Sequence, residues 1–347
     1  MIVSFYDKDF NGLQDNASLV IDNNSYSLIK RGVEFDELKC TCEPFTEDIQ
    51  PTFLVVKNDK GNYIYGCLAG IPTLTAENKT VITGTDLKSM FKSDVLLDFS
   101  VPPTTVNALF SNVFNAWLAQ VNQTSLSCEL VFKDNVGVIS LSDLVPTGKG
   151  KFNAWSDIFS PYLRYYGLYM VGSLNLVQKK VIFTVGKAMY KDLNIKLWEH
   201  GLRDYGKWVA DINECQGYVL NTSTGTYTAG YKWILTSNNA ITTNPANRDI
   251  YPIKRRIILK ETDDGAEVTQ LLNEANQEAL ELLCGSLYKE DITLSGIQAD
   301  FETKFNIYVR RGGGLYKSLP CGELHYDANG LKKVQIGYRF TGLQFLI

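Results

Sequence analysis

The hydrophobic pattern is clearest over residues 217–285, where it predicts two strands followed by a helix. Large apolar side chains occupy every second position of the first strand, the period of a strand with one buried face. They are Tyr227, Ala229, Tyr231, Trp233 and Leu235. A second strand is expected at Ile253–Leu259. The period then becomes that of an α-helix with one apolar face. That face consists of Val268, Leu271, Leu272, Ala275, Ala279, Leu282 and Leu283.

Both ends of this helix have recognisable signals. Asp264 and Glu267 stand three residues apart before the apolar face, the spacing of a capping box. Gly285 follows the face as the residue expected to end the helix in a left-handed conformation. Two further β segments, Ile292–Phe305 and Val334–Leu346, come after it. This region of the chain therefore predicts a β-rich unit with one helix.

The N-terminal region, residues 2–81, predicts a small barrel or sandwich of short strands separated by turn signals. The apolar or alternating runs are Leu19–Ile21, Tyr26–Ile29, Phe53–Val56 and Tyr63–Leu68. Asn58-Asp-Lys-Gly is expected to turn a hairpin between the last two runs. Thr85 or Asp86 then caps a short helix. Its buried side chains are expected to be Leu87, Met90 and Phe91.

Pro102 and Pro103 interrupt the pattern and predict a domain boundary. Thr104 or Thr105 is expected to cap a helix with a broad apolar face. That face consists of Val106, Leu109, Phe110, Val113, Phe114, Trp117, Leu118 and Val121. The elements expected next are β structure at Leu126–Leu141, a loop at Lys149–Lys151, a helix from Ala154 to Gly167, and a hairpin of Leu168–Val171 with Lys180–Val185.

These elements predict a β-rich α+β fold with three domains. The first is a β-rich domain over residues 1–100 that ends in a short helix. The second is an inserted α/β subdomain over residues 101–190, and the third is a β-rich domain with one long helix over residues 191–347.

The composition is that of a packed protein and excludes several classes. Of the 347 residues, 45% are hydrophobic and 21% are charged, which argues against extensive disorder. The net charge is −4, and acidic and basic residues are interspersed along the chain. The sequence therefore lacks the excess of basic residues that is typical of DNA-binding proteins. No apolar run approaches the ~20 residues of a membrane span, and the N-terminus lacks the pattern of a signal peptide. Seven cysteines, an odd number, favour free thiols in a protein folded in the cytoplasm.

The residues that could carry chemistry are few. His200 and His325 are the only histidines, and we expect both to be structural. Cys40 and Cys42 are separated by one residue, which fits one face of a strand better than a zinc site. Gly148-Lys-Gly-Lys lacks the strand–loop–helix context of a phosphate-binding loop.

Charged motifs also have structural interpretations. Gly312–Gly314 is expected to form a turn, and Lys254–Arg256 is expected to face solvent or acidic groups of a partner. Asp263-Asp264 and Glu47-Asp48 are expected in turns or at helix starts. The sequence therefore predicts no catalytic, cofactor-binding or metal-ligating residue and no cofactor. It assigns no interface residues, and we do not expect an enzyme.

The element order resembles that of the hub proteins at the tip of long-tailed phages, also called tail-associated (Tal-type) or baseplate hub proteins. The segments that carry the resemblance are Gly217-Tyr-Val-Leu-Asn, the Tyr227–Leu235 strand, Arg248-Asp-Ile-Tyr-Pro-Ile, Lys254-Arg-Arg-Ile-Ile-Leu, the Leu271–Leu283 helix and the closing strands around Gly342. The Gly84-Thr-Asp-Leu turn into a short helix also resembles this family.

The resemblance implies a structural virion protein at the distal end of a tail tube. Each subunit of a homotrimer would give two tube-forming, β-barrel-like domains to a pseudo-sixfold ring, here roughly residues 1–100 and 190–347. The implied partners are further copies of the chain, the distal tail protein, the tape-measure protein and receptor-binding proteins. DNA would only pass through in transit, with no stable insertion into a membrane. The protein would be made in the bacterial host cytoplasm and reside in the virion. Because the chain ends at Ile347, we expect a compact hub without a lytic domain.

A carbohydrate- or receptor-binding module is the alternative. It is motivated by the tyrosine-rich segment Tyr162–Tyr169, interpreted as a strand. Aromatic platforms bind sugars, although aromatic side chains at strand spacing are more often buried in a core. An enzyme is the third hypothesis.

Overall fold

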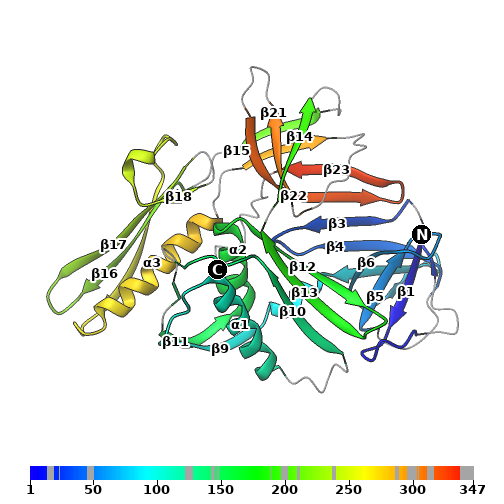
Figure 1. The fold of residues 1–347 in the computed structure, drawn as a ribbon, viewed down its shortest axis with the longest axis horizontal. Coiled ribbons are helices and arrows are strands. Elements are labelled where there is room, and N and C mark those ends of the chain that lie inside the picture. Colours follow the sequence, from blue (N-terminus) through cyan, green and yellow to red (C-terminus); the bar gives the residue numbers. More distant parts are fainter. Residues whose placement is uncertain are drawn as a thin grey trace.

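The computed structural model describes most of the chain. The described residues are 1–13, 19–22, 24–44, 51–121, 128–141, 145–146, 148–187, 189–196, 202–208, 212–236, 240–285, 289–294, 303, 305–310 and 316–336. They form a β-rich α+β fold, as the sequence predicts. Figure 1 shows the N-terminal strands on one side of the molecule. On the opposite side, a smaller sheet projects with one helix packed against it.

The N-terminal strands form a sheet with antiparallel pairing throughout. They are β1 Ile2–Tyr6, β2 Leu19–Val20, β3 Ser27–Arg31, β4 Glu37–Cys42, β5 Phe53–Lys57, β6 Tyr63–Ala69, β7 Thr73–Leu74 and β8 Thr80–Thr85. The expected hairpin joins β5 and β6, with Gly61 in the left-handed conformation at its turn. The predicted short helix is the 3-10 turn η1, Leu87–Phe91, and Asp86 caps it by accepting a hydrogen bond from the Lys88 amide.

Strands from the C-terminal region of the chain extend the same sheet. They are β14 Met189–Lys196, β15 Leu202–Trp208, β20 Lys289–Leu294, β21 Phe305–Arg310, β22 Tyr316–Asp327 and β23 Gly330–Ile336. The main strand order is β15-β20-β23-β22-β3-β4-β8-β6-β5-β1-β2. The β22–β3 ladder, with Leu324 opposite Lys30, therefore joins the two ends of the chain edge to edge.

The two expected β-barrel-like domains are not confirmed, because no sheet formed by the described residues closes into a barrel. Among the N-terminal strands, an isolated bridge between Ile21 and Cys42 brings the β2 edge back toward β4. The apolar side chains inside this curved sheet form a core of their own. They include Val3, Phe5, Leu28, Leu38, Leu54, Val56 and Ile82.

The middle of the chain folds around an aromatic core. Its elements are β9 Asp94–Phe99, α1 Val106–Gln120, β10 Glu129–Asn135, β11 Gly148–Asn153, the π-helical turn η3 Ala154–Phe159, α2 Ser160–Tyr165, β12 Leu168–Asn175 and β13 Lys180–Lys187. Thr105 caps α1 as expected. The Phe91 ring, from η1, lies 4.7 Å from the Trp117 ring and 4.6 Å from the Phe183 ring, measured between centroids. This core thereby connects the first β unit to the middle subdomain.

One prediction for the middle region is wrong and another is confirmed only in part. Lys149–Lys151 is not a loop but belongs to strand β11, which pairs with β9. Lys149 forms an ion pair with Asp98 at 2.8 Å, and Lys151 forms one with Asp94 at 3.0 Å. These cross-strand ion pairs offset the low strand propensity of Gly and Lys. Of the predicted segment Leu126–Leu141, only Glu129–Asn135 is strand among its described residues.

The projecting outer unit consists of a four-stranded sheet and one helix (Figure 1). Its elements are β16 Glu214–Asn221, β17 Thr226–Leu235, β18 Ile241–Thr242, the 3-10 turn η5 Pro245–Asn247, β19 Arg255–Thr262 and α3 Val268–Gly285. The predicted helix is thus confirmed, and its last residue is Gly285. The predicted second strand starts two residues later than expected.

Two details of the outer unit differ from the sequence pattern. Trp233 and Leu235 are buried, but Tyr227 and Tyr231 are exposed, so the alternating strand has a buried face only in its second half. The capping box is not formed as predicted. The Asp264 side chain accepts from the Ala266 amide, and the Glu267 carboxylate accepts from the Thr262 hydroxyl.

Some predicted elements lie outside the described residues. They are the turn at Gly312–Gly314, residues Glu47-Asp48, and the closing segment beyond Ile336, which includes Gly342. The predicted segment Ile292–Phe305 contains the end of β20 and the first residue of β21.

Close approach of α3 to its sheet depends on Gly217. A Cβ atom there would lie 2.8 Å from the backbone carbonyl carbon of Ala275 and 2.9 Å from its oxygen. Such distances are too short for a real contact, and helix backbone cannot move aside as a flexible side chain does.

We therefore expect Gly217→Ala to destabilise the protein by about 1–3 kcal/mol, because the added methyl group pushes α3 off the sheet. The matched control is Gly150→Ala in β11, where the nearest atom to the new methyl group is 3.9 Å away. Urea unfolding would compare the two variants. Equal unfolding free energies would contradict the close-packing argument.

Candidate assembly interfaces

The sequence suggested a few residues as candidates for chemistry. Those that the structure describes have structural roles. Cys40 and Cys42 are both buried on the same face of β4, as expected. The Nε2 atom of His325 lies 2.8 Å from Glu323 Oε2, a structural contact on β22. His200 lies outside the described residues. Among the described residues no group of three or more His, Cys, Asp or Glu side chains could hold a metal ion.

The tyrosine-rich segment does not form the expected strand. Tyr162 and Tyr165 belong to helix α2, and only from Leu168 onward is the backbone extended. Tyr162 is completely buried in the aromatic core, where its ring lies 6.4 Å from that of Phe110. It therefore cannot present a sugar-binding platform in this conformation.

The three regions of the chain meet at the turn formed by residues 31–36, between β3 and β4. The Gly32 carbonyl accepts a hydrogen bond from the Met170 amide of β12 at 3.0 Å. A Cβ atom on Gly32 would lie 3.0 Å from the Thr303 carbonyl oxygen. Arg164 of α2 forms an ion pair with Glu34. The turn is therefore in contact with both the middle subdomain and the C-terminal region.

A buried lysine, which the sequence analysis missed, holds this turn from inside. Lys88 in η1 is 1% exposed, and its Nζ donates to the carbonyl oxygens of Arg31 at 2.9 Å and Glu34 at 2.6 Å. The same atom lies 3.1 Å from Asp86 Oδ2. Its charge is thus both paired and hydrogen-bonded, the condition under which a charge can be buried.

Asp36 completes this buried charge network, which we define as Arg31, Asp36, Asp86, Lys88 and Glu323. The Asp36 amide donates to Asp86 Oδ2 at 2.9 Å, and its carboxylate accepts from the Arg31 amide at 2.6 Å. Burial, and then the negative charge of Asp86, raise the pKa of Asp36 to about 7, although Lys88 acts in the opposite direction.

Arg31 and Glu323 carry the network across to β22. Arg31 Nε donates to Glu323 Oε1 at 2.8 Å, and the Glu323 side chain is 3% exposed. Burial opposes ionisation of Glu323. The hydrogen bond from His325 and the charge of Arg31 outweigh it and lower the pKa of Glu323 to about 2. The carboxylate is therefore ionised in the folded protein at neutral pH, and the ion pair joins β3 to β22.

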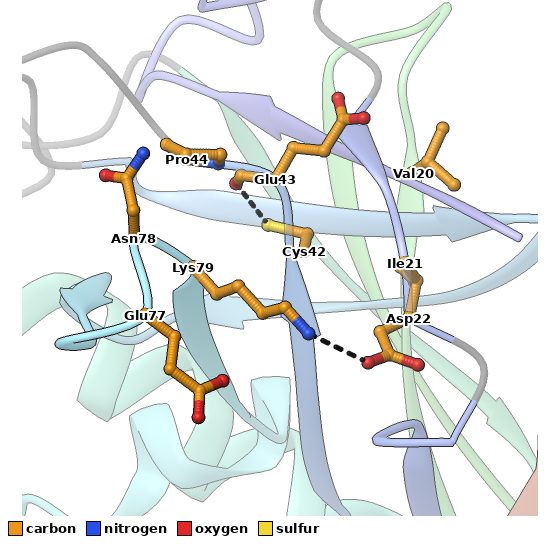
Figure 2. A pocket seen from close by; sticks show the side chains of 9 residues that line it. All are labelled: Val20, Ile21, Asp22, Cys42, Glu43, Pro44, Glu77, Asn78 and Lys79. Carbon is orange, nitrogen blue, oxygen red and sulfur yellow. Dashed lines mark hydrogen bonds and ion pairs between the residues drawn. The ribbon is translucent and has the colours of Figure 1, made fainter.

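A hollow of about 410 Å³ opens at the rim of the N-terminal sheet (Figure 2). It is lined by Val20, Ile21, Asp22, Cys42, Glu43, Pro44, Glu77, Asn78 and Lys79. Lys79 Nζ reaches across it to within 3.5 Å of Asp22 Oδ2. Burial, and then the Glu43 charge, raise the pKa of Cys42 to about 12, so its thiol stays protonated and is a weak nucleophile. The hollow is open to solvent, and Cys42 does not supply it with an activated nucleophile.

The outer unit exposes apolar side chains on the sheet face that lies away from α3. Gly217 faces the helix, so its neighbours Gln216 and Tyr218 face the other way. They stand opposite Ile257 and Leu259 of β19, which are 53% and 46% exposed. Tyr227 and Ala229 of β17 belong to the same face by register. Ile257, Leu259 and Tyr227 are exposed on this face, whereas Gln216 is buried and hydrogen-bonded by the Arg255 side chain.

No helix among the described residues is long and apolar enough to cross a membrane. No protein-family model matches the chain, and no curated protein matches it.

Three solved structures match the chain over nearly its whole length. The prophage MuSo2 43 kDa tail protein from Shewanella oneidensis is 11% identical, with a TM-score of 0.52, and the match covers 97% of this chain and 98% of that one. The prophage tail protein gp18 from Listeria monocytogenes is 8% identical, with a TM-score of 0.51 and coverages of 98% and 95%. A tail protein from Neisseria meningitidis is 11% identical, with a TM-score of 0.51 and coverages of 97% and 95%.

The chain has the fold of a tail protein. The resemblance seen in the sequence is therefore confirmed at the level of the fold. The regions that match include the outer unit as well as the large sheet, since nearly all of each chain is covered.

The raised pKa of Asp36 predicts a specific pH dependence of stability. An unfolded carboxyl group titrates near pH 4, whereas the folded group titrates near 7, so folding becomes less favourable as the pH rises between these values. One such proton contributes at most about 1.4 kcal/mol per pH unit. We expect Asp36→Asn to flatten the fall in unfolding free energy between about pH 4 and 7.

Glu323 affects stability in a different pH range, because its lowered pKa reduces the unfolding free energy only as the pH falls below about 4.

The measurement is urea unfolding at several pH values. The control is Asp59→Asn, since that side chain is 87% exposed. An unchanged pH slope in Asp36→Asn would show that Asp36 does not retain its proton in the folded protein.

Proposed function

We propose that the chain is a structural virion protein, the baseplate hub at the distal end of a phage tail. In this proposal a trimeric ring closes the tail tube and connects it to the host-recognition apparatus. The observation that carries the proposal is the match to three tail proteins over almost the full length of this chain and of each of theirs. A match at 8–11% identity concerns the fold, so the role at the tail tip is our inference from it.

The strand order supports a ring of this kind. The β22–β3 ladder already joins an N-terminal and a C-terminal β unit edge to edge within one chain. The two ends of this sheet path differ, because β2 curls back toward β4 through the Ile21–Cys42 bridge, whereas β15 ends the path on the other side. Contacts between two different surfaces of neighbouring copies are heterologous, and such contacts generate a ring when the rotation closes. Three chains with two β units each would then offer six similar edges to a sixfold tube.

In the proposed domain organisation, the chain consists of three domains, residues 1–100, 101–190 and 191–347. In the assembled tail tip the ring would contact the distal tail protein, the tape-measure protein and receptor-binding proteins. DNA would pass through the channel without being held, in keeping with a net charge of −4. We propose a structural role rather than a catalytic one. With only two histidines, one of them paired with Glu323, the chain offers little for acid–base catalysis.

The direct test is the absolute mass of the purified chain by light scattering over a range of concentrations. We expect a species of three times 38.9 kDa, which electron microscopy should show as a ring with a central channel. A 38.9 kDa monomer at every concentration, with no ring in the micrographs, would contradict the trimeric hub.

A carbohydrate- or receptor-binding module remains the alternative, now on different residues. Tyr227, Tyr231 and Tyr251 of the outer unit are each at least 60% exposed, and exposed tyrosines can stack on sugars. We expect no glycan-array binding from the wild-type chain if the hub proposal is correct. Binding that disappears in Tyr227→Ala or Tyr231→Ala, with the fold unchanged, would favour the alternative.

A further inference from the structure

Strand β19 lies at the edge of the outer sheet. The order β18-β17-β16-β19 leaves its second side without a partner strand among the described residues. The strand is 8 residues long, and Ile257 and Leu259 on it are about half exposed. Long apolar edge strands tend to recruit other chains, and natural proteins usually cover them with a helix, a loop or charges. On β19 the apolar stretch Ile257–Leu259 lies between charged residues on both sides, so a partner that covers this edge would meet both kinds of side chain.

The start of this edge has an excess of positive charge. Arg255 Nε lies 3.1 Å from Glu214 Oε1, and Glu214 is also paired with Arg248. For Lys254 and Arg256, by contrast, no carboxylate among the residues that the structure describes lies within ion-pair distance. The β19 edge therefore combines apolar side chains with cations that a partner could pair.

The opposite charge is concentrated in the next segment of the same unit. Residues 261–285 contain no Lys or Arg, and their acidic residues are Glu261, Asp263, Asp264, Glu267, Glu274, Glu278 and Glu281. Glu267 and Glu274 are both exposed and stand two helical turns apart, on one side of α3. Glu274 accepts from Gln270 at 3.0 Å, a neutral partner.

Within one copy, a single ion pair already joins the two surfaces. Lys260 of β19 lies 2.7 Å from Glu278 of α3. Arg256 lies on the same face of β19 as Lys260, since alternate strand residues share a face, and Glu274 stands one helical turn from Glu278 on α3. The other charges on the two surfaces are opposite in sign. Complementary charge of this kind selects the partner and the register of a contact.

We infer that the β19 edge of one copy docks on the acidic side of α3 in a second copy, with Arg256 and Lys254 facing Glu274 and Glu267. The inference rests on the proposed trimer and names a contact within it. The two surfaces differ, so the contact is head-to-tail and can repeat around a closed ring. It covers the apolar edge with a helix, and the half-buried Leu271 and Leu272 of α3 offer apolar area to Ile257 and Leu259.

The test is a charge exchange in the full-length chain, read as the concentration at which half the protein is trimeric. We expect Arg256→Glu and Glu274→Arg each to raise this concentration by about tenfold or more, since like charges then face each other at three interfaces. The double variant should restore assembly to near the wild-type midpoint. Added salt should raise the wild-type midpoint.

Lys60→Glu is the matched control, because Lys60 is exposed in the turn between β5 and β6 and the variant makes the same change of charge. Circular dichroism and thermal unfolding would establish that each variant is folded. A wild-type trimer that Arg256→Glu and Glu274→Arg leave unchanged would overturn this contact while leaving the proposed hub intact. Variants that keep the trimer but lose binding to another tail protein would identify a different occupant, and would also overturn it. A wild-type chain that stays monomeric throughout would overturn both the contact and the trimer.

Discussion

The ion pair between Lys88 and Asp86 is the interaction on which the arrangement of the three regions depends. Lys88 is almost fully enclosed, so its charge is tolerable only while Asp86 and the carbonyl oxygens of Arg31 and Glu34 surround it. Those carbonyl groups belong to the turn that also contacts β12 and Thr303. Loss of the ammonium group would leave Asp86 buried without its counter-charge and the two carbonyl oxygens without their donor, which would weaken the contact between η1 and the turn.

The outer unit is attached in a different way, through apolar packing. Ala279, Leu280 and Leu283 at the end of α3 belong to the same core as Phe110, Phe159 and Tyr162. The first half of α3 extends beyond that core, and its apolar positions Leu271 and Leu272 are only half buried. One end of the unit is therefore fixed to the body, while the other end presents a sheet edge and a helix surface outward (Figure 1). A unit of this shape is suited to contacts with neighbouring molecules.

Local sequence patterns predicted the helices well, whereas contacts between residues distant in sequence could not be predicted from them. The apolar period and the cap at Thr105 located α1, and the period alone located α3. Strand β11 was missed because Gly148-Lys-Gly-Lys forms a strand only opposite β9, some fifty residues earlier, where Asp94 and Asp98 neutralise its lysines. Lys88 was missed for the same reason. In the sequence it is one polar residue of a short helix, and its partners in the 31–36 turn become apparent only once the chain has folded.

The weak sequence identity to the matched tail proteins has a physical explanation that bears on function. A fold of this kind requires apolar residues at the correct period and small residues where backbones meet, as at Gly217 and Ala275, but not particular side chains. Surface residues are free to change as long as each contact remains complementary to its own partner. The fold can therefore be shared at about one identical residue in ten. Specificity of assembly would then reside in the exposed edges and helices, and the buried network would keep those surfaces in a fixed arrangement.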